Sequence, residues 1–214
     1  MSQDPNLHVI QHALIEDRLG RMRRKDTPPQ EFRQCMREIA DILAIEASRN
    51  LPVMEKEIET PITTTTIKTL DKQRLPLIVP ILRAGLGLSQ GMQDALPEAD
   101  TGHIGVYRDE ETHRPVEYLV KLPKHLDRPV FVCDPMLATG HSMEKTLDVL
   151  IERGAKESSI VIVTLLCAPE GIEVIRNRFK NIPIYTAALD SHLNENAYIV
   201  PGLGDAGDRI FGTV

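Results

Sequence analysis

The chain of 214 residues contains no tryptophan, and aromatic residues make up only 4% of it. Proteins that bind single-stranded nucleic acids stack bases on aromatic side chains, so this chain has few residues for such a surface. Positive charge is not in excess either, because 25 lysines and arginines stand against 31 aspartates and glutamates and leave a formal net charge of −6. Binders of nucleic acids and of membrane surfaces use a basic face to meet phosphates, so we expect neither partner.

Cysteines are also scarce. The three present, Cys35, Cys133 and Cys167, are widely spaced and odd in number, which fits a reducing compartment without structural disulfides. The N-terminal MSQDPNLHVI has no basic segment followed by an apolar stretch, and no apolar run reaches the length of a membrane span. We therefore expect a cytoplasmic protein. The seven histidines show no zinc-ligand spacing.

The length and the 42% hydrophobic content allow a sizeable core, and at about 150 residues per domain we expect a single domain over residues 1–214. Short apolar runs predict strands at 75–82, 103–107, 129–134, 159–166 and 183–189. Several are almost wholly apolar, and helical patterns separate some of them, which is typical of strands buried on both faces in βαβ units. The predicted fold class is α/β, an open, mostly parallel twisted sheet flanked by helices.

Amphipathic patterns over 12–25 and 27–50 predict an N-terminal helical part of about residues 1–50, a candidate for a separate lobe. The β-branched PITTTTIKTL at 61–70 predicts a strand. Polar turn residues between two extended pieces predict a hairpin arm over about 106–122 that projects from the sheet.

The run from Gly202 to Gly207 has the G-x-G-x-x-G spacing associated with dinucleotide-binding turns. That use requires a crossover helix, a further strand and an acidic residue about 20 positions on. Only Asp208 to Val214 follow, so the interpretation as a dehydrogenase fails. The glycines interleaved with Asp205 and Asp208 need another explanation.

One predicted strand end carries a candidate anion site. Ligands of open α/β sheets bind beyond the carboxyl ends of the strands, and VFVC is followed by Asp134, by PMLATGHS and by a helical pattern. Backbone N–H groups at a helix start, with the hydroxyls of Thr139 and Ser142, form an anion cradle. The loop lacks the lysine of a Walker motif, so ATP hydrolysis is disfavoured. A carboxylate at its entrance suits sugar hydroxyls, so a ribose with one 5′-phosphate fits better than a triphosphate.

These segments resemble the uracil-specific branch of the type I phosphoribosyltransferase family. VCDPMLATGHS is similar to the loop with which that family binds phosphoribosyl pyrophosphate (PRPP), and PILRAGLG, HIGVYRDEET, VEYLVKLP and YIVPGLGDAGDR agree in the same order. The resemblance covers nearly the whole chain. Two departures are His141, where the family usually has glycine, and a hairpin more apolar than the usual VEYYNKLP.

The resemblance implies a glycosyltransferase that transfers the phosphoribosyl group of PRPP to uracil and yields uridine monophosphate (UMP) and pyrophosphate in pyrimidine salvage. It implies Mg²⁺ that arrives with PRPP and is not held by the protein alone, with Asp205 as a candidate contact. It also implies a homodimer or higher homo-oligomer. GTP activates some members of the family, so the basic cluster from Arg21 to Lys25 is either part of an effector site or a solvated helix end.

By the same resemblance, PRPP is bound by several separate segments and uracil by a C-terminal loop of about 198–209. The implied PRPP site comprises Arg83, Ala84, Gly85, Arg108, Asp134, Pro135, Met136, Leu137, Ala138, Thr139, Gly140, His141, Ser142 and Asp205. The implied uracil site comprises Ile199, Gly204, Asp205 and Ala206, and the candidate catalytic residues are Asp205 and Arg83. Glycines let the main chain approach the base, and cytosine would present a donor where an acceptor is needed, a mismatch that can discriminate by roughly 10⁴-fold or more.

Two other functions stay open on the sequence. A regulatory RNA-binding protein can be built on the same fold, although the acidic balance and the few aromatic residues leave no RNA-binding footprint. A nucleoside kinase or another phosphate-handling α/β enzyme would need the Walker lysine that is missing here.

Overall fold

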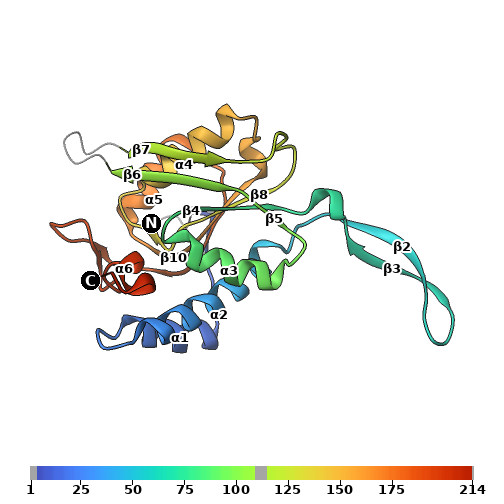
Figure 1. Cartoon of the computed structure of the whole chain (residues 1–214), viewed down its shortest axis with the longest axis horizontal. Coiled ribbons are helices and arrows are strands. Elements are labelled where there is room, and N and C mark those ends of the chain that lie inside the picture. Colours follow the sequence, from blue (N-terminus) through green and yellow to red (C-terminus); the bar gives the residue numbers. More distant parts are fainter. Residues whose placement is uncertain (1–3, 109–114, 214) are drawn as a thin grey trace.

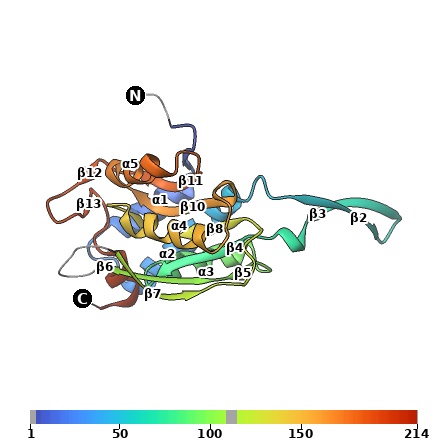
Figure 2. The same ribbon diagram turned by 90° about the horizontal axis from the view of Figure 1, so that it is seen from above.

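A central sheet with helices on both faces forms the body of the protein, and one long hairpin stands clear of it (Figures 1 and 2). The computed structural model describes residues 4–108 and 115–213, with the side chains of Arg108 and Pro115 left out. Along the main sheet the strand order is β1-β11-β10-β8-β4-β6-β7. All neighbours are parallel except β6 and β7. This is the predicted fold class.

The five predicted strands are all present in this sheet. They are β4 (Leu77–Leu82), β6 (His103–Arg108), β8 (Val130–Cys133), β10 (Ile160–Cys167) and β11 (Ile184–Leu189). The sheet also contains β1 (Leu7–Val9), β5 (Asp100–Thr101), β7 (Pro115–Lys121) and β9 (Met136–Leu137). The short β1 was not predicted, because three residues carry too little pattern.

Each face of the sheet carries its own hydrophobic cluster, because successive side chains of a strand point to opposite sides. Ile78 of β4 belongs to the cluster under α1 (Ala13–Arg23), α2 (Pro29–Ala47) and α3 (Gly85–Ala95). Its neighbours Leu77 and Val79 belong to the cluster under α4 (His141–Glu152) and α5 (Pro169–Arg178). The central strands are therefore buried on both faces, as their apolar runs predict.

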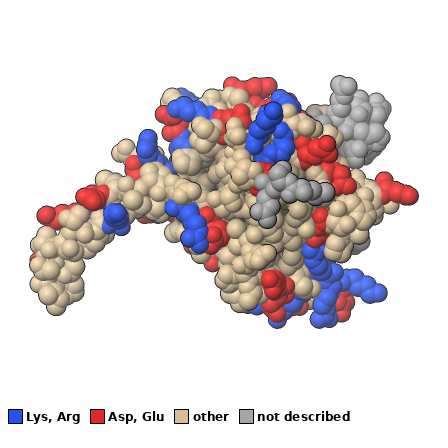
Figure 3. All heavy atoms as spheres, turned by 180° about the vertical axis from the view of Figure 1, so that it is seen from behind, with Lys and Arg blue, Asp and Glu red and all other residues tan. Residues whose placement is uncertain are grey.

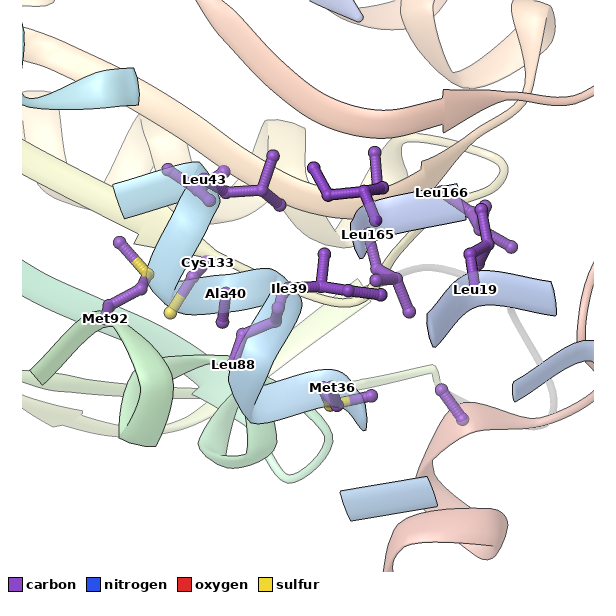
Figure 4. Close-up of a cluster of buried hydrophobic side chains, with 14 of the residues drawn as sticks. Leu19, Met36, Ile39, Ala40, Leu43, Leu88, Met92, Cys133, Leu165 and Leu166 are labelled. Carbon is purple, nitrogen blue, oxygen red and sulfur yellow. The ribbon is translucent and has the colours of Figure 1, made fainter. Parts of the chain in front are cut away.

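The N-terminal helices do not form a separate lobe, so that interpretation is wrong. The apolar stripe of α2, with Phe32, Met36, Ile39 and Leu43, is fully buried and belongs to the same cluster as residues of α3 and β10. Figure 4 shows this packing, with Leu88 and Leu165 among the neighbours of α2. The apolar stripe of α2 is therefore buried against the sheet and α3, and not within a lobe made of the N-terminal helices alone.

The structure contains two hairpins. Strands β6 and β7 pair antiparallel from His103 to Lys121 at the edge of the main sheet, and their tip at 109–114 lies outside the described residues. The hairpin that stands clear of the body is β2 (Val53–Glu59) with β3 (Thr64–Leu70), which we call the arm (Figures 1 and 2). The predicted strand at 61–70 is β3. Its partner β2 was missed because VMEKEIE mixes charges with apolar residues and buries neither face.

Shorter elements complete the chain. They are the 3-10 turns Lys72–Arg74 and Glu157–Ser159, the paired β12 (His192–Leu193) and β13 (Ile199–Val200), and α6 (Ala206–Phe211). Among residues 4–108 and 115–213, no helix has the length and apolar character needed to cross a membrane.

Candidate active site

A pocket of about 240 Å³ opens where the loop after β8 meets residues 198–209, which we call the tail loop. The pocket lies beyond the carboxyl ends of the central parallel strands, the usual place for ligands in such a sheet. Its lining residues are Ala84, Asp134, Met136, Ala138, Ala197, Tyr198, Ile199, Gly204, Asp205, Ala206 and Gly207. Most of these residues come from the two segments that sequence reasoning assigned to PRPP and to uracil.

The 134–142 loop has the strand-loop-helix context that an anion cradle needs. It leaves β8 at Cys133, pairs briefly with β10 through β9, and enters α4 at His141. Gly140 stands before the helix with φ of +80°, a backbone conformation that side chains disfavour. The first N–H groups of α4 have no acceptor within the helix, so they point out of the helix start. Thr139 and Ser142, both half-buried, lie beside them.

A glycine of α5 lies directly behind this loop. A Cβ atom on Gly171 would come 2.5 Å from the carbonyl oxygen of Ala138 and 2.6 Å from that of Leu137. A Cβ atom on Gly140 would in turn come 2.8 Å from the carbonyl oxygen of Gly171. The loop and the start of α5 can approach this closely only without side chains. Sequence reasoning missed Gly171, because one glycine in a helical pattern carries no sign of its partner.

Burial raises the pKa of Asp134 to about 7. The backbone N–H of Met136 opposes this rise, whereas the negative charge of the nearby Asp205 adds to it. Water solvates a carboxylate better than this enclosed site does, so the charged form is disfavoured. The pocket therefore holds an acid whose neutral form is favoured more than in a solvated aspartate.

Asp205 has a structural task as well as a place in the pocket. It is the N-cap residue of α6, and its Oδ1 accepts a hydrogen bond from the N–H of Asp208 at 2.9 Å. Too few residues follow the glycines for a crossover helix, but the short α6 that they do form was not predicted. The signal was present, because aspartate is a preferred N-cap residue.

Arg83 follows β4 and is exposed. Its guanidinium carbon lies 5.7 Å from the ring centroid of Phe211, so the residue lies beside the C-terminal helix. Gly85 begins α3, and a Cβ atom there would come 2.5 Å from the carbonyl oxygen of Cys133. Arg108 ends β6, and its side chain lies outside the described atoms.

The remaining predicted residues lie around the pocket without lining it. Pro135 and Leu137 belong to the 134–142 loop, and both are buried. His141 is 56% exposed, and its Nδ1 lies 3.7 Å from a carboxylate oxygen of Glu144 on its own helix. Ala197 lines the pocket and was not foreseen, because alanine has no side-chain group that marks a site.

In the described part of the chain, no group of three or more histidine, cysteine or acidic side chains is placed to hold a metal ion. Asp134 and Asp205 are the acids that line the pocket.

Comparisons with known proteins agree over almost the full length. A family model described as "Uracil phosphoribosyltransferase" matches residues 9–213. The uracil phosphoribosyltransferase of Burkholderia ambifaria (strain MC40-6) is 50% identical over 216 residues, which cover 100% of this chain and 99% of that protein. The enzyme of the same name from Ralstonia pickettii (strain 12J) is 48% identical with the same coverage.

Solved structures give the same result for the fold. The AQ2163 protein from Aquifex aeolicus superposes with a TM-score of 0.89 at 34% identity, covering 96% of this chain and 97% of that one. A purine phosphoribosyltransferase from Pyrococcus horikoshii Ot3 reaches a TM-score of 0.50 at 18% identity, covering 72% of this chain and 81% of that one, a likeness of fold alone.

Proposed function

The chain belongs to the uracil phosphoribosyltransferase family, and on that basis we propose how its residues carry the reaction. The protein transfers the phosphoribosyl group of PRPP to uracil, forming UMP and releasing pyrophosphate. One observation carries the proposal, namely that the 134–142 loop and the tail loop line one pocket. A sugar-phosphate donor on the first loop and a base on the second would meet there.

The 134–142 loop is proposed to hold the ribose phosphate of PRPP. The N–H groups at the start of α4 suit the 5′-phosphate, because a helix N-terminus favours negative charge. Asp134 suits the ribose hydroxyls, which can donate hydrogen bonds to its carboxylate. The backbone N–H groups of Ala84 and Gly85, with Arg83 and Arg108, suit the diphosphate, since planar guanidinium groups pair with phosphate in a bidentate way.

The tail loop is proposed to read uracil with its main chain. Ile199, Gly204 and Ala206 line the pocket, and Gly204 has φ of +80°. Uracil presents two carbonyl acceptors on either side of one N–H donor, and exposed backbone groups can match that edge. Displacement of pyrophosphate at the anomeric carbon develops positive charge on the sugar, so the carboxylate of Asp205 is proposed to act there.

The acids of the pocket fit Mg²⁺ bound together with PRPP. Magnesium prefers phosphate oxygens, water and a few carboxylates, and Asp134 and Asp205 supply such oxygens. When bound, the ion neutralises charge on the departing pyrophosphate. We propose that Asp205 contacts it, directly or through water.

The experiment that tests the proposed function is an assay of UMP formation from uracil, PRPP and Mg²⁺, with cytosine and purine bases as controls. We expect UMP from uracil and almost no product from the other bases. Product from a purine base but not from uracil would contradict the assignment. ATP consumption, or RNA binding that weakens with salt, would instead favour the alternatives that the sequence left open.

We propose that the protein forms a homo-oligomer, because the arm exposes apolar side chains that a second copy could cover. Its exposed apolar side chains include Val53 (56%), Met54 (50%) and Ile62 (91%), and a lone two-stranded hairpin is marginal in water. Figure 3 shows that few charged side chains cover its outer half. Packing of the arm on a second copy would bury these residues, and sedimentation would then report a multiple of the protomer mass.

GTP activation is proposed from the family resemblance alone. The basic cluster from Arg21 to Lys25 supports it weakly, because Arg23 pairs with Asp190 at 2.6 Å and Arg24 with Asp26 at 2.9 Å. Rates of UMP formation with and without GTP test the proposal.

Arg83→Ala is expected to raise the KM for PRPP about 10- to 100-fold, because a hydrogen bond to a charged group contributes about 1.5–3 kcal/mol. The fold should survive, since Arg83 is exposed. Arg178→Ala is the matched control, because it also removes an exposed arginine from a phenylalanine ring, at 5.1 Å. A PRPP KM at the wild-type value in Arg83→Ala would refute the assignment.

Gly171→Ala is expected to lower kcat/KM for PRPP about 10- to 100-fold, because a displacement near 1 Å at a binding loop can have an effect of this size. The added methyl group would lie too close to the carbonyl oxygens of Leu137 and Ala138, so the loop and α5 must move apart. Steady-state kinetics measure the effect. Gly20→Ala is the control, since a Cβ atom there meets nothing within 4 Å. Equal kinetics in the two variants would contradict a supporting role for Gly171.

A further inference from the structure

A partly buried ion pair between Arg23 and Asp190 lies directly behind the tail loop. Arg23 ends α1, and Asp190 follows β11 at the same sheet edge as the pocket. The Arg23 Nη2 lies 2.6 Å from the Asp190 Oδ1, and the Asp190 side chain is only 5% exposed. The Arg23 Nη1 donates to the Asp190 Oδ2 at 2.8 Å, so the contact is bidentate.

The pair binds both backbone groups of Gly202. The N–H of Gly202 donates to the Asp190 Oδ2 at 2.9 Å, and the Gly202 carbonyl accepts from the Arg23 Nη1 at 2.7 Å. Gly202 has φ of +59°, and a Cβ atom there would come 2.0 Å from the carbonyl oxygen of Ile199. The backbone turn that leads from Ile199 to Gly204 is thus held at its centre by two opposite charges.

A second arginine fastens the next residue of the loop. The Arg209 Nη1 donates to the carbonyl of Leu203 at 2.8 Å and also to that of Met22, and its Nη2 donates to the carbonyl of Arg24 at 2.5 Å. Its guanidinium carbon lies 4.5 Å from the ring centroid of Phe32. The end of α1 therefore holds the tail loop at two consecutive residues.

We infer that the Arg23–Asp190 pair is a positioning device that sets the tail-loop backbone for base recognition and so controls discrimination between uracil and cytosine. Both carboxylate oxygens of Asp190 already accept hydrogen bonds from protein groups, so it acts through Gly202 rather than on a substrate. Exposed and buried ion pairs alike contribute little to stability compared with apolar packing, and a role in specificity accounts better for this partly buried one. The inference rests on the proposed role of the tail loop.

The test is Arg23→Lys, with Arg176→Lys as the matched control. Lysine keeps the charge, but it lacks the planar fork that reaches Asp190 and Gly202 together. Arg176 likewise combines a carboxylate, Asp4 at 2.6 Å, with backbone carbonyls of Ile182 and Asn6, but it lies away from this pocket. Asp190→Asn is a second variant that keeps an acceptor for Gly202, and melting curves establish that each variant is folded.

We expect Arg23→Lys to raise the uracil KM by at least about 10-fold, the change that the loss of one hydrogen bond to a charged group typically produces. The ratio of kcat/KM for uracil over cytosine should fall by a similar factor, with the PRPP KM unchanged. Arg176→Lys should lower the melting temperature without changing any of these values. The inference would be overturned if Arg23→Lys and Arg176→Lys showed the same uracil kinetics. It would also be overturned if Arg23→Lys raised the KM for uracil and the KM for PRPP by the same factor.

Gly204→Ala separates this inference from the proposal on which it rests. Its added methyl group meets nothing closer than 3.9 Å, but the positive φ strains the loop backbone itself. A raised uracil KM in Gly204→Ala together with wild-type kinetics in Arg23→Lys refutes only the positioning role. An unchanged uracil KM in Gly204→Ala refutes base reading by the tail loop, and the positioning role with it.

Discussion

Asp205→Asn is expected to lower kcat for UMP formation by about 10²–10³-fold, the usual cost of removing one preorganised electrostatic group from a transition state. The uracil KM should change little, because the proposed contacts with the base come from the backbone. Asparagine is as good an N-cap residue as aspartate, so α6 should keep its first turn and the loop its shape. The substitution thus removes charge without removing structure.

Single-turnover and steady-state kinetics measure this effect. Asp208→Asn is the control, because Asp208 belongs to the same helix but does not line the pocket. Near-normal turnover in Asp205→Asn would show that the carboxylate has no part in the chemistry. A second result should accompany the loss of kcat. Because the charge of Asp205 helps to raise the pKa of Asp134, that pKa should fall in the variant.

Asp134→Asn is expected to stabilise the protein at pH 8 while it strongly weakens PRPP binding. The pKa of Asp134 is about 7 when folded, against about 4 for an unfolded chain. Between these values the folded state keeps a proton that the unfolded state has released, so stability falls as pH rises and the full penalty is present above pH 7. Asparagine has no such penalty. The melting temperature should rise by about 2–4 °C for each 1 kcal/mol relieved.

Melting curves of wild type and Asp134→Asn at pH 4 and pH 8 test the sign. The difference between the two proteins should be small at pH 4, open between pH 4 and pH 7, and stay constant above. Glu152→Gln, at the exposed C-terminal end of α4, controls for a general effect of removing an acid. The same difference at both pH values would show that Asp134 titrates as an ordinary aspartate.

Much of the fold could be predicted from local patterns. Strands such as Ile160–Cys167 are buried on both faces, so their apolar runs stand out against the helices between them. The stripe of α2 was equally clear, although its burial against the sheet was not. The 134–142 loop could be recognised as a candidate site because the residues that suggest it are consecutive, and three of them line the pocket.

The parts that escaped prediction depend on contacts between distant residues. Gly171 matters through the carbonyl groups of Leu137 and Ala138, and nothing near it in the chain reveals them. Arg23 belonged to a basic cluster whose effect on the tail loop only tertiary structure shows. Strand β2 was missed for another reason, since both its faces are exposed and its sequence carries no period.

The hydrogen bonds that hold the tail loop join residues very far apart in the chain, and this affects the order of events in folding. Arg23 and Asp190 are 167 positions apart, Arg23 and Gly202 are 179 apart, and Met22 and Arg209 are 187 apart. Contacts of such separation form slowly, because the chain must first close a long loop. During synthesis the end of α1 can make these contacts only after almost the whole chain has been made, so the tail loop should reach its final position late in folding.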